Sequence, residues 1–353
     1  MNAVVETTNM DSPRAPVAAP HATHKFKLLL KREFWEHKGG FFWAPVIAGG
    51  ISLVLTLMAI IVGLVAARRA ADAGHLELDG INVSGLDLGQ LTQQMSPQDM
   101  AEFANGINLS LVLGSSWPFI VLAFVVFFYS LGALYDERKD RSVLFWKSLP
   151  LSDTETVLSK VASAVLVAPA IAVGVAILTM FAFMVMISAV VVMHGGNAWT
   201  LIWGPASPMG IIAGHLAWIP VYALWALPTV GWLLLCSVWA RSAPFLWAVM
   251  VPVVAGVLVS WFKLMDLFNL DASWFWTNIV GRALLGTVPA IDQVYRDDFS
   301  ESVTNSGLEN LVGDMSFTHQ IASLSMPDLW IGAIAGAAMI FAAIRLRRWR
   351  DEG

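Results

Sequence analysis

Five long apolar segments constrain this chain more than any other feature of its sequence. Each reaches the roughly 18 residues that a helix needs to cross a bilayer, and none contains Asp, Glu, Lys or Arg. A sixth, shorter run is followed by four arginines, which is typical of the cytoplasmic end of a span. The runs are Trp43–Ala67, Leu111–Leu134, Val161–Met193, Ile211–Ala240, Phe245–Phe262 and Leu329–Ile344. The pattern predicts an all-α integral membrane protein built as a six-helix transmembrane bundle.

The distribution of charged residues predicts the orientation of these helices. With the N-terminus in the cytoplasm, 16 of the 21 Lys and Arg residues fall in cytoplasmic segments, as the positive-inside rule requires. The weak point is the pair Arg68–Arg69, two of the five remaining basic residues, at the outer end of the first span. Of the 26 acidic residues, 15 fall in two outer segments, residues 70–110 and 263–328. We therefore expect a multi-pass protein of the bacterial inner (cytoplasmic) membrane, with both termini cytoplasmic and a flexible tail over residues 1–24.

The segment before the first span predicts an interfacial helix over Lys25–Lys38. Phe26, Leu30 and Phe34 recur at helical spacing and form an apolar stripe beside several lysines. Such a helix lies in the plane of the membrane surface with its apolar side buried. Gly39–Gly40 is expected to end it.

The third span is predicted to begin before its apolar run. Ser152 and Glu155 have the spacing of a capping box, which places the first turn at Asp153. A helix from Asp153 to Met193 would be about 60 Å long at 1.5 Å per residue. The hydrocarbon layer is only about 30 Å thick, so this helix should project into the cytoplasm.

The outer segment before the last span is too long for a simple turn. Residues 272–291 are apolar but interrupted by two glycines, an arginine and a proline. This pattern predicts re-entrant outer half-helices, whose broken backbone must be buried against protein. Residues 292–327 are polar and expected in water, and residues 70–110 are expected to be partly helical.

Motifs for catalysis and ligand binding are missing from the sequence. It contains no GxxxxGK[ST] phosphate loop and no HExxH, GxSxG or CxxC motif, so it predicts no catalytic residue, no metal and no cofactor in this chain. The net charge of −5 gives no reason to expect nucleic acid. Within the long apolar runs His215 is the ionisable side chain of note, whereas ion-coupled transporters use intramembrane carboxylates or His chains. A transporter of this kind needs another energy source, most simply a cytoplasmic partner ATPase.

The connection between the second and third spans is the candidate for receiving that energy. A charged stretch, residues 135–142, is followed by the apolar quartet 143–146 and by Leu-Pro-Leu-Ser. A short helix over 139–148 would set apolar and basic groups side by side, which suits docking into a cleft of a soluble partner. The charged stretch could also be a positive-inside anchor. The candidate coupling residues are Glu137, Arg138, Lys139, Arg141, Val143, Leu144, Phe145, Trp146, Pro150, Ser152 and Glu155.

This loop resembles the cytoplasmic loop of ABC-2 type permeases, the membrane subunits of a class of ABC exporters. The likeness lies in the order of charged residues, apolar quartet, Leu-Pro-Leu-Ser, Glu155 and Lys160. The interfacial helix, with Lys31, Arg32, Glu33 and Trp35, and the re-entrant segment resemble the same family. The outer segments are longer than in the commonest members, so no substrate can be carried over.

The resemblance implies a permease dimer, expected to be a homodimer, that works with two copies of a separate ABC ATPase. ATP and Mg²⁺ would bind to that partner, and the 139–148 helix would dock on its nucleotide-binding subunits. Family breadth suggests a peptide, a lipid or lipid-linked molecule, or a hydrophobic drug as substrate. Trp225 and Trp232 are candidates for the substrate path, since indoles stack on ligands. The alternatives are a passive channel or membrane scaffold, or a lipid-modifying integral membrane enzyme.

Tryptophans and glycines add two further expectations. Tryptophans near span ends should form belts at the membrane interfaces, and small residues should lie where helices approach closely. The tryptophans are Trp43, Trp117, Trp199, Trp239, Trp261, Trp274 and Trp330, and the glycines are Gly132, Gly174, Gly231 and Gly256.

Overall fold

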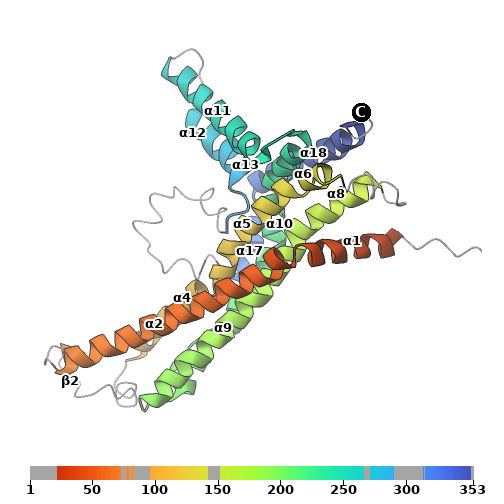
Figure 1. Cartoon of the computed structure of the whole chain (residues 1–353). Helices are drawn as coiled ribbons and strands as arrows, with labels where there is room; N and C mark the ends of the chain where they lie inside the picture. Colours follow the sequence, from red (N-terminus) through yellow and green to blue (C-terminus); the bar gives the residue numbers. More distant parts are fainter. Residues whose placement is uncertain are drawn as a thin grey trace, which may run out of the picture.

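The computed structural model describes residues 22–72, 77–78, 81–82, 96–141, 152–265, 271–289, 313 and 315–350, and this part of the chain is overwhelmingly helical (Figure 1). Six helical segments are long and apolar enough to cross a membrane, as the sequence predicts. They are Gly39–Ala66, Pro97–Lys139, Asp153–Met193, Pro208–Trp239, Pro244–Leu264 and Pro327–Trp349. The prediction of a multi-pass helical membrane protein is confirmed at this level.

The helical segments are built from elements that follow one another with short irregularities. Four of the joints are π-helical turns, labelled η1 to η4, and one two-stranded antiparallel ladder, β1 with β2, follows the first span. The elements are α1 (Ala22–Glu36), η1 (Gly39–Trp43), α2 (Ala44–Asp72), β1 (Glu77–Leu78), β2 (Ile81–Asn82), α4 (Pro97–Ser115), α5 (Trp117–Gly132), α6 (Tyr135–Lys139), α8 (Asp153–Ala162), η2 (Ser163–Val167), α9 (Ala168–Met193), η3 (Trp199–Trp203), α10 (Pro208–Trp239), α11 (Pro244–Leu264), α12 (Ala272–Phe275), η4 (Trp276–Gly281), α13 (Arg282–Leu284), α17 (Phe317–Ser323) and α18 (Pro327–Arg350).

Helix α10 forms the centre of the bundle. In its most apolar 18-residue stretch 72% of the residues are buried, against 17% for the first span and for α11. Figure 1 shows α11 and α12 projecting together from one side, away from the other spans. The outer faces of α2 and α11 are rich in exposed Ile, Leu and Val, which suits helices in contact with hydrocarbon.

Close backbone approaches hold α18 against α10. A Cβ at Gly336 would lie 2.4 Å from the carbonyl carbon of Leu227, and one at Gly231 would lie 2.6 Å from the Gly336 carbonyl oxygen. Small residues allow such approaches between membrane helices. The expectation is confirmed for Gly231 and for Gly256, which packs on an indole. It is wrong for Gly174, where an added Cβ would meet no described residue within 4 Å beyond the nearby backbone of its own helix, and for Gly132, where the Cβ would meet only the carboxylate of Asp136, four residues further along the chain.

Helix α1 ends at Glu36, close to the predicted end at Gly39–Gly40, but the chain does not leave helical backbone at the two glycines. The backbone remains right-handed helical from Lys38 to Ala44 through the turn η1. Figure 1 shows α1 and α2 following one another with a bend. Because hydrogen bonds in η1 stay within the helix, the two glycines need not end it.

The outer segment before α18 also differs from the prediction. Gly281 and Arg282 do not break the helix, since α12, η4 and α13 follow one another through helical backbone, and the chain leaves the helix after Leu284. Residues 290–312 lie outside the described residues. The part of the polar stretch that the structure describes is not all in water, because α17 packs on α10 with Gln320 and Ser323 buried. The second span likewise begins earlier than expected, at a capping box of Ser96 with Asp99.

All seven tryptophans expected at membrane interfaces are exposed on the protein surface, with between 38% and 70% of each residue accessible. Large exposed indoles are costly in water but favourable at a lipid interface. Their exposure agrees with the membrane assignment.

Candidate functional site

A largely buried group of charged side chains lies at the end of the bundle where α1, α6, α8 and the end of α18 meet (Figure 1). We call it the charged cluster. It contains three acids and three bases, so its formal charges balance: Glu33, Glu137, Asp153, Arg32, Lys160 and Arg347.

Lys160, on α8, is the centre of the cluster. Its Nζ lies 3.0 Å from Oε1 of Glu33 on α1 and 3.0 Å from Oε1 of Glu137 on α6. The side chain of Lys160 is 2% exposed, that of Glu33 is 0% and that of Glu137 is 7%. One ammonium group therefore joins three helices away from solvent.

Arg347 makes a second junction, from α18. Its Nη1 lies 3.0 Å from Oε2 of Glu137, and its Nε lies 3.2 Å from Oδ1 of Asp153. Glu137 thus binds Lys160 through one oxygen and Arg347 through the other. Arg32 adds a longer contact, 3.5 Å, from α1 to Glu137.

The remaining oxygen of Glu33 is held by α5. The Tyr129 hydroxyl donates to Glu33 Oε2 at 2.8 Å. The ring of Tyr129 packs against His37 and Phe41, with centroids 4.7 Å and 4.9 Å away. Both carboxylate oxygens of a fully buried Glu33 are therefore hydrogen-bonded, which buried charges require.

Arg138, next to Glu137, attaches α6 to the end of α10. Its Nη2 donates to the carbonyl oxygens of Ser237 and Ala240, at 2.6 Å and 2.9 Å. A cation at a helix C-terminus satisfies carbonyl groups that have no partner within the helix. In the reverse direction, the N–H groups of Leu134 and Tyr135 donate to the Ser237 hydroxyl. This short helix is consequently fixed to the central span.

The capping box at the start of α8 is confirmed. The Ser152 hydroxyl accepts from the Glu155 N–H at 3.1 Å, and the Ser152 N–H donates to the Glu155 carboxylate at 3.0 Å. From Asp153 the helical backbone runs to Met193 with the turn η2 inside it. The long predicted helix is therefore present.

These contacts join the helix that precedes residues 142–151 to the helix that follows them. Glu137 precedes that segment and Asp153 follows it, and Arg347 binds both. Removing one partner from a buried ion pair costs about 3–5 kcal/mol, because a charge then stays buried alone. These ion pairs connect the two flanks to each other and to α1 and α18.

The structure assigns the predicted coupling residues to different positions. Glu137 faces inward in the charged cluster, and Arg138 donates a hydrogen bond to a carbonyl oxygen at the end of α10. Lys139 and Arg141 are exposed. The predicted helix does not begin at Lys139, since α6 ends there and a turn with a positive φ at Arg141 follows. Val143, Leu144, Phe145, Trp146 and Pro150, and with them the rest of the 139–148 helix, lie outside the described residues.

The interfacial-helix residues are similarly divided. Lys31 and Trp35 are exposed, whereas Arg32 is partly buried and Glu33 fully buried. The buried side of α1 is centred on Leu29 and Glu33, one position away from the predicted stripe. Glu33 lies on the buried side because its carboxylate binds Lys160 and Tyr129 in the bundle.

Sequence reasoning missed three members of the cluster as site residues, Asp153, Lys160 and Arg347, and it missed Tyr129 beside them. The sequence of α8 gives a partial indication of the cluster, because positions 153, 156 and 160 are polar and lie on the same helix face. No comparable signal selects Arg347 from the four arginines at the end of the chain.

The two tryptophans proposed for a substrate path lie on the same side of α10. Trp232 lines a cavity between α10 and α11, and its Nε1 donates to the Ala248 carbonyl at 2.9 Å. Trp225 is 3% exposed and lies beneath the guanidinium group of Arg282.

Comparisons of the chain with protein-family models, with curated proteins and with solved structures found no match.

Proposed function

We propose that this chain is the membrane subunit of an ATP-driven exporter whose ATPase is a separate polypeptide. The six apolar helical segments supply a membrane domain. The resemblance of residues 135–160 to the loop of ABC-2 type permeases supports assignment to that family. Membership would imply two permease chains and two ATPase copies.

The observation that carries the proposal is the charged cluster beside residues 142–151. A partner that binds this segment would act directly on Glu137 and Asp153, one at each flank. Their common partner Arg347, together with Lys160, connects them to α18 and α1. Since α8 continues into the third span, movement at the segment reaches the membrane without a flexible joint.

The charge content of the spans supports the same proposal. In the described part of the five long apolar runs, His215 is the ionisable group of note, and it is buried with its Nδ1 2.9 Å from the Ile211 carbonyl oxygen. Proton or sodium coupling normally uses carboxylates within the membrane. Energy from ATP hydrolysis in a partner fits this chain better than energy from an ion gradient.

Purification of the tagged chain from native membranes in a mild detergent tests the proposal. We expect a soluble subunit with a GxxxxGK[ST] motif to co-purify at a ratio close to one per permease chain, identified by mass spectrometry. A passive channel, a scaffold or a lipid-modifying enzyme predicts no such subunit. Recovery of the chain without any nucleotide-binding protein, under conditions in which the chain stays folded, would count against the exporter.

A further inference from the structure

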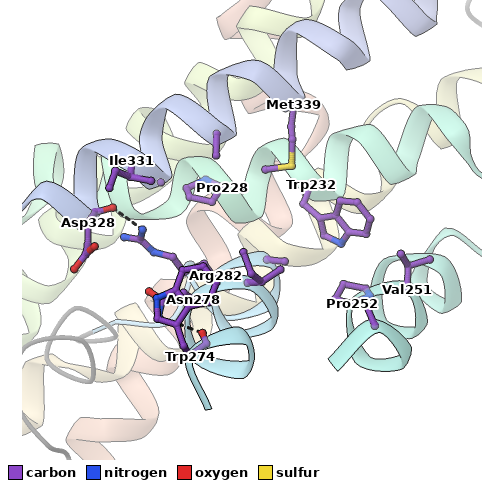
Figure 2. A pocket seen from close by; sticks show the side chains of 15 residues that line it. Pro228, Trp232, Val251, Pro252, Trp274, Asn278, Arg282, Asp328, Ile331 and Met339 are labelled. Atoms are coloured by element: carbon purple, nitrogen blue, oxygen red, sulfur yellow. Dashed lines mark hydrogen bonds between the residues drawn. The ribbon is translucent and has the colours of Figure 1, made fainter. Parts of the chain in front are cut away.

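A cavity of about 510 Å³ lies between α10, α11, the η4–α13 segment and α18 (Figure 2). Its volume is within the range of about 300–1,000 Å³ that is typical of small-molecule sites. Most of its walls are apolar, with Pro228 and Trp232 from α10, Val251 and Pro252 from α11, and Met339 from α18. The charged cluster does not contribute to it.

One end of this cavity holds a fixed positive charge, the guanidinium group of Arg282. The residue is 8% exposed, and its guanidinium carbon lies 4.4 Å from the centre of the Trp225 ring. Its Nη1 donates to the main-chain carbonyl of Asp328, as the dashed line in Figure 2 shows. Gly332 leaves room for the group, because a Cβ there would lie 2.7 Å from Nη1.

The backbone of Arg282 is also fixed. The Thr229 hydroxyl on α10 donates to the Arg282 carbonyl at 2.6 Å and accepts from the Gly286 N–H at 2.9 Å. Asp328 is the other ionisable residue among the described residues of the lining; it is exposed and bonds Arg282 through its main chain. The cation thus has a defined position at the cavity wall.

The cavity opens sideways onto an apolar surface. Val251, Ile279 and Ile331 line it and are 37%, 43% and 63% exposed. In a membrane protein such side chains face hydrocarbon. A ligand would therefore enter from the lipid phase.

We propose that this cavity binds an anionic amphiphile, with its negatively charged headgroup at Arg282 and one acyl chain along the apolar walls. Arginine forms strong charge-assisted hydrogen bonds with phosphate and carboxylate groups. The walls formed by Val251, Pro252 and Met339 offer an alkyl chain apolar contact and few competing polar groups. The proposal requires only the membrane domain and does not depend on a partner ATPase.

Native mass spectrometry of the full chain in a non-ionic detergent tests this site. The probes are lysophosphatidylglycerol, lysophosphatidylcholine with the same acyl chain, and inorganic phosphate. We expect the anionic lysolipid to bind at least tenfold more tightly than the zwitterionic one, and phosphate alone not to bind measurably. Equal affinities of the two lysolipids, or phosphate binding as tight as that of the lysolipid, would overturn the proposal.

Substitutions identify the cavity as the site. Arg282→Gln should remove the preference for the anionic lysolipid, whereas Arg282→Lys should keep most of it. Lys263→Gln is the matched control, because Lys263 is an exposed cation at the end of α11. A preference that survives Arg282→Gln unchanged, or that Lys263→Gln abolishes to the same extent, would contradict the assignment.

A second variant keeps the test valid if Arg282→Gln does not fold. Ala335 lines the cavity from an exposed position on α18, so Ala335→Leu should fill part of the space without disturbing the core. We expect at least a tenfold loss of anionic lysolipid binding at unchanged thermal stability. Retained binding would refute the site, and so would conversion of a dimer to a monomer by this variant, which would show that a second copy covers the opening.

Discussion

Replacing Lys160 with methionine is the sharpest test of the charged cluster. The substitution preserves length and apolar contact but removes the ammonium group that lies 3.0 Å from each of two carboxylates. Glu33 and Glu137, 0% and 7% exposed, would then remain buried without this partner. Uncompensated charges of this kind cost about 3–5 kcal/mol, which corresponds to roughly a hundredfold to several thousandfold in the folding equilibrium.

The free energy of unfolding can be measured in mixed micelles by titration with sodium dodecyl sulfate, followed by tryptophan fluorescence. Lys27→Met is the control, because Lys27 is exposed on α1, and it should leave the transition unchanged. The double variant Lys160→Met with Glu33→Gln removes both charges, and Glu137 keeps Arg347. It should recover a large part of the loss. A loss below about 1 kcal/mol for Lys160→Met, or a double variant less stable than the single one, would refute the reasoning.

Two other substitutions test how the helices are joined. Arg138→Met should lower the free energy of unfolding by about 2–3 kcal/mol in the same assay, because two carbonyl groups at the end of α10 lose a charged donor. Arg138→Lys should recover part of this loss. An unchanged transition for the methionine variant would show that this junction is not needed. Gly336→Ala should strongly lower the yield of folded protein in size-exclusion chromatography, because its Cβ would lie 2.4 Å from a backbone carbon of α10. Gly174→Ala is the control, because a Cβ there would meet no described residue within 4 Å beyond the nearby backbone of its own helix. Equal yields from the two alanine variants would contradict the packing described.

The membrane helices could be predicted because their signal is carried by length and composition alone. A run of apolar residues that can span the hydrocarbon layer has few alternatives, since its backbone must be hydrogen-bonded internally. The start of α8 was equally readable, because Ser152 and Glu155 satisfy each other locally. No distant residue is needed for either feature.

The charged cluster could not be predicted, because it depends on contacts between residues far apart in the sequence. Lys160 directly precedes an apolar run, where a lysine can equally extend its ammonium group to the membrane surface. Only the packing of α1 and α6 against α8 directs it inward. The same packing buries Glu33 completely, whereas Phe34 packs against the core and is only partly buried.

The prediction for the outer segment before α18 was wrong for a different reason. Gly281 was expected to break the helix because glycine has a low helix propensity, and Arg282 because its charge interrupts the apolar run. In the structure Gly281 has ordinary helical dihedral angles, and Arg282 is held by Asp328 and the Trp225 ring. Tertiary contacts of this kind override local propensity.

The most direct test of the central claim is the amount of ATPase that the chain retains through residues 142–151. Wild-type chain and a variant carrying Phe145→Ala and Trp146→Ala would be purified in parallel from the same membranes, with Trp199→Ala, at an exposed position of η3, as control. We predict about one ATPase per chain for the wild type and the control, and at least a tenfold loss for the loop variant at unchanged thermal stability. Equal retention by the loop variant, or no ATPase with the wild type, would contradict the account.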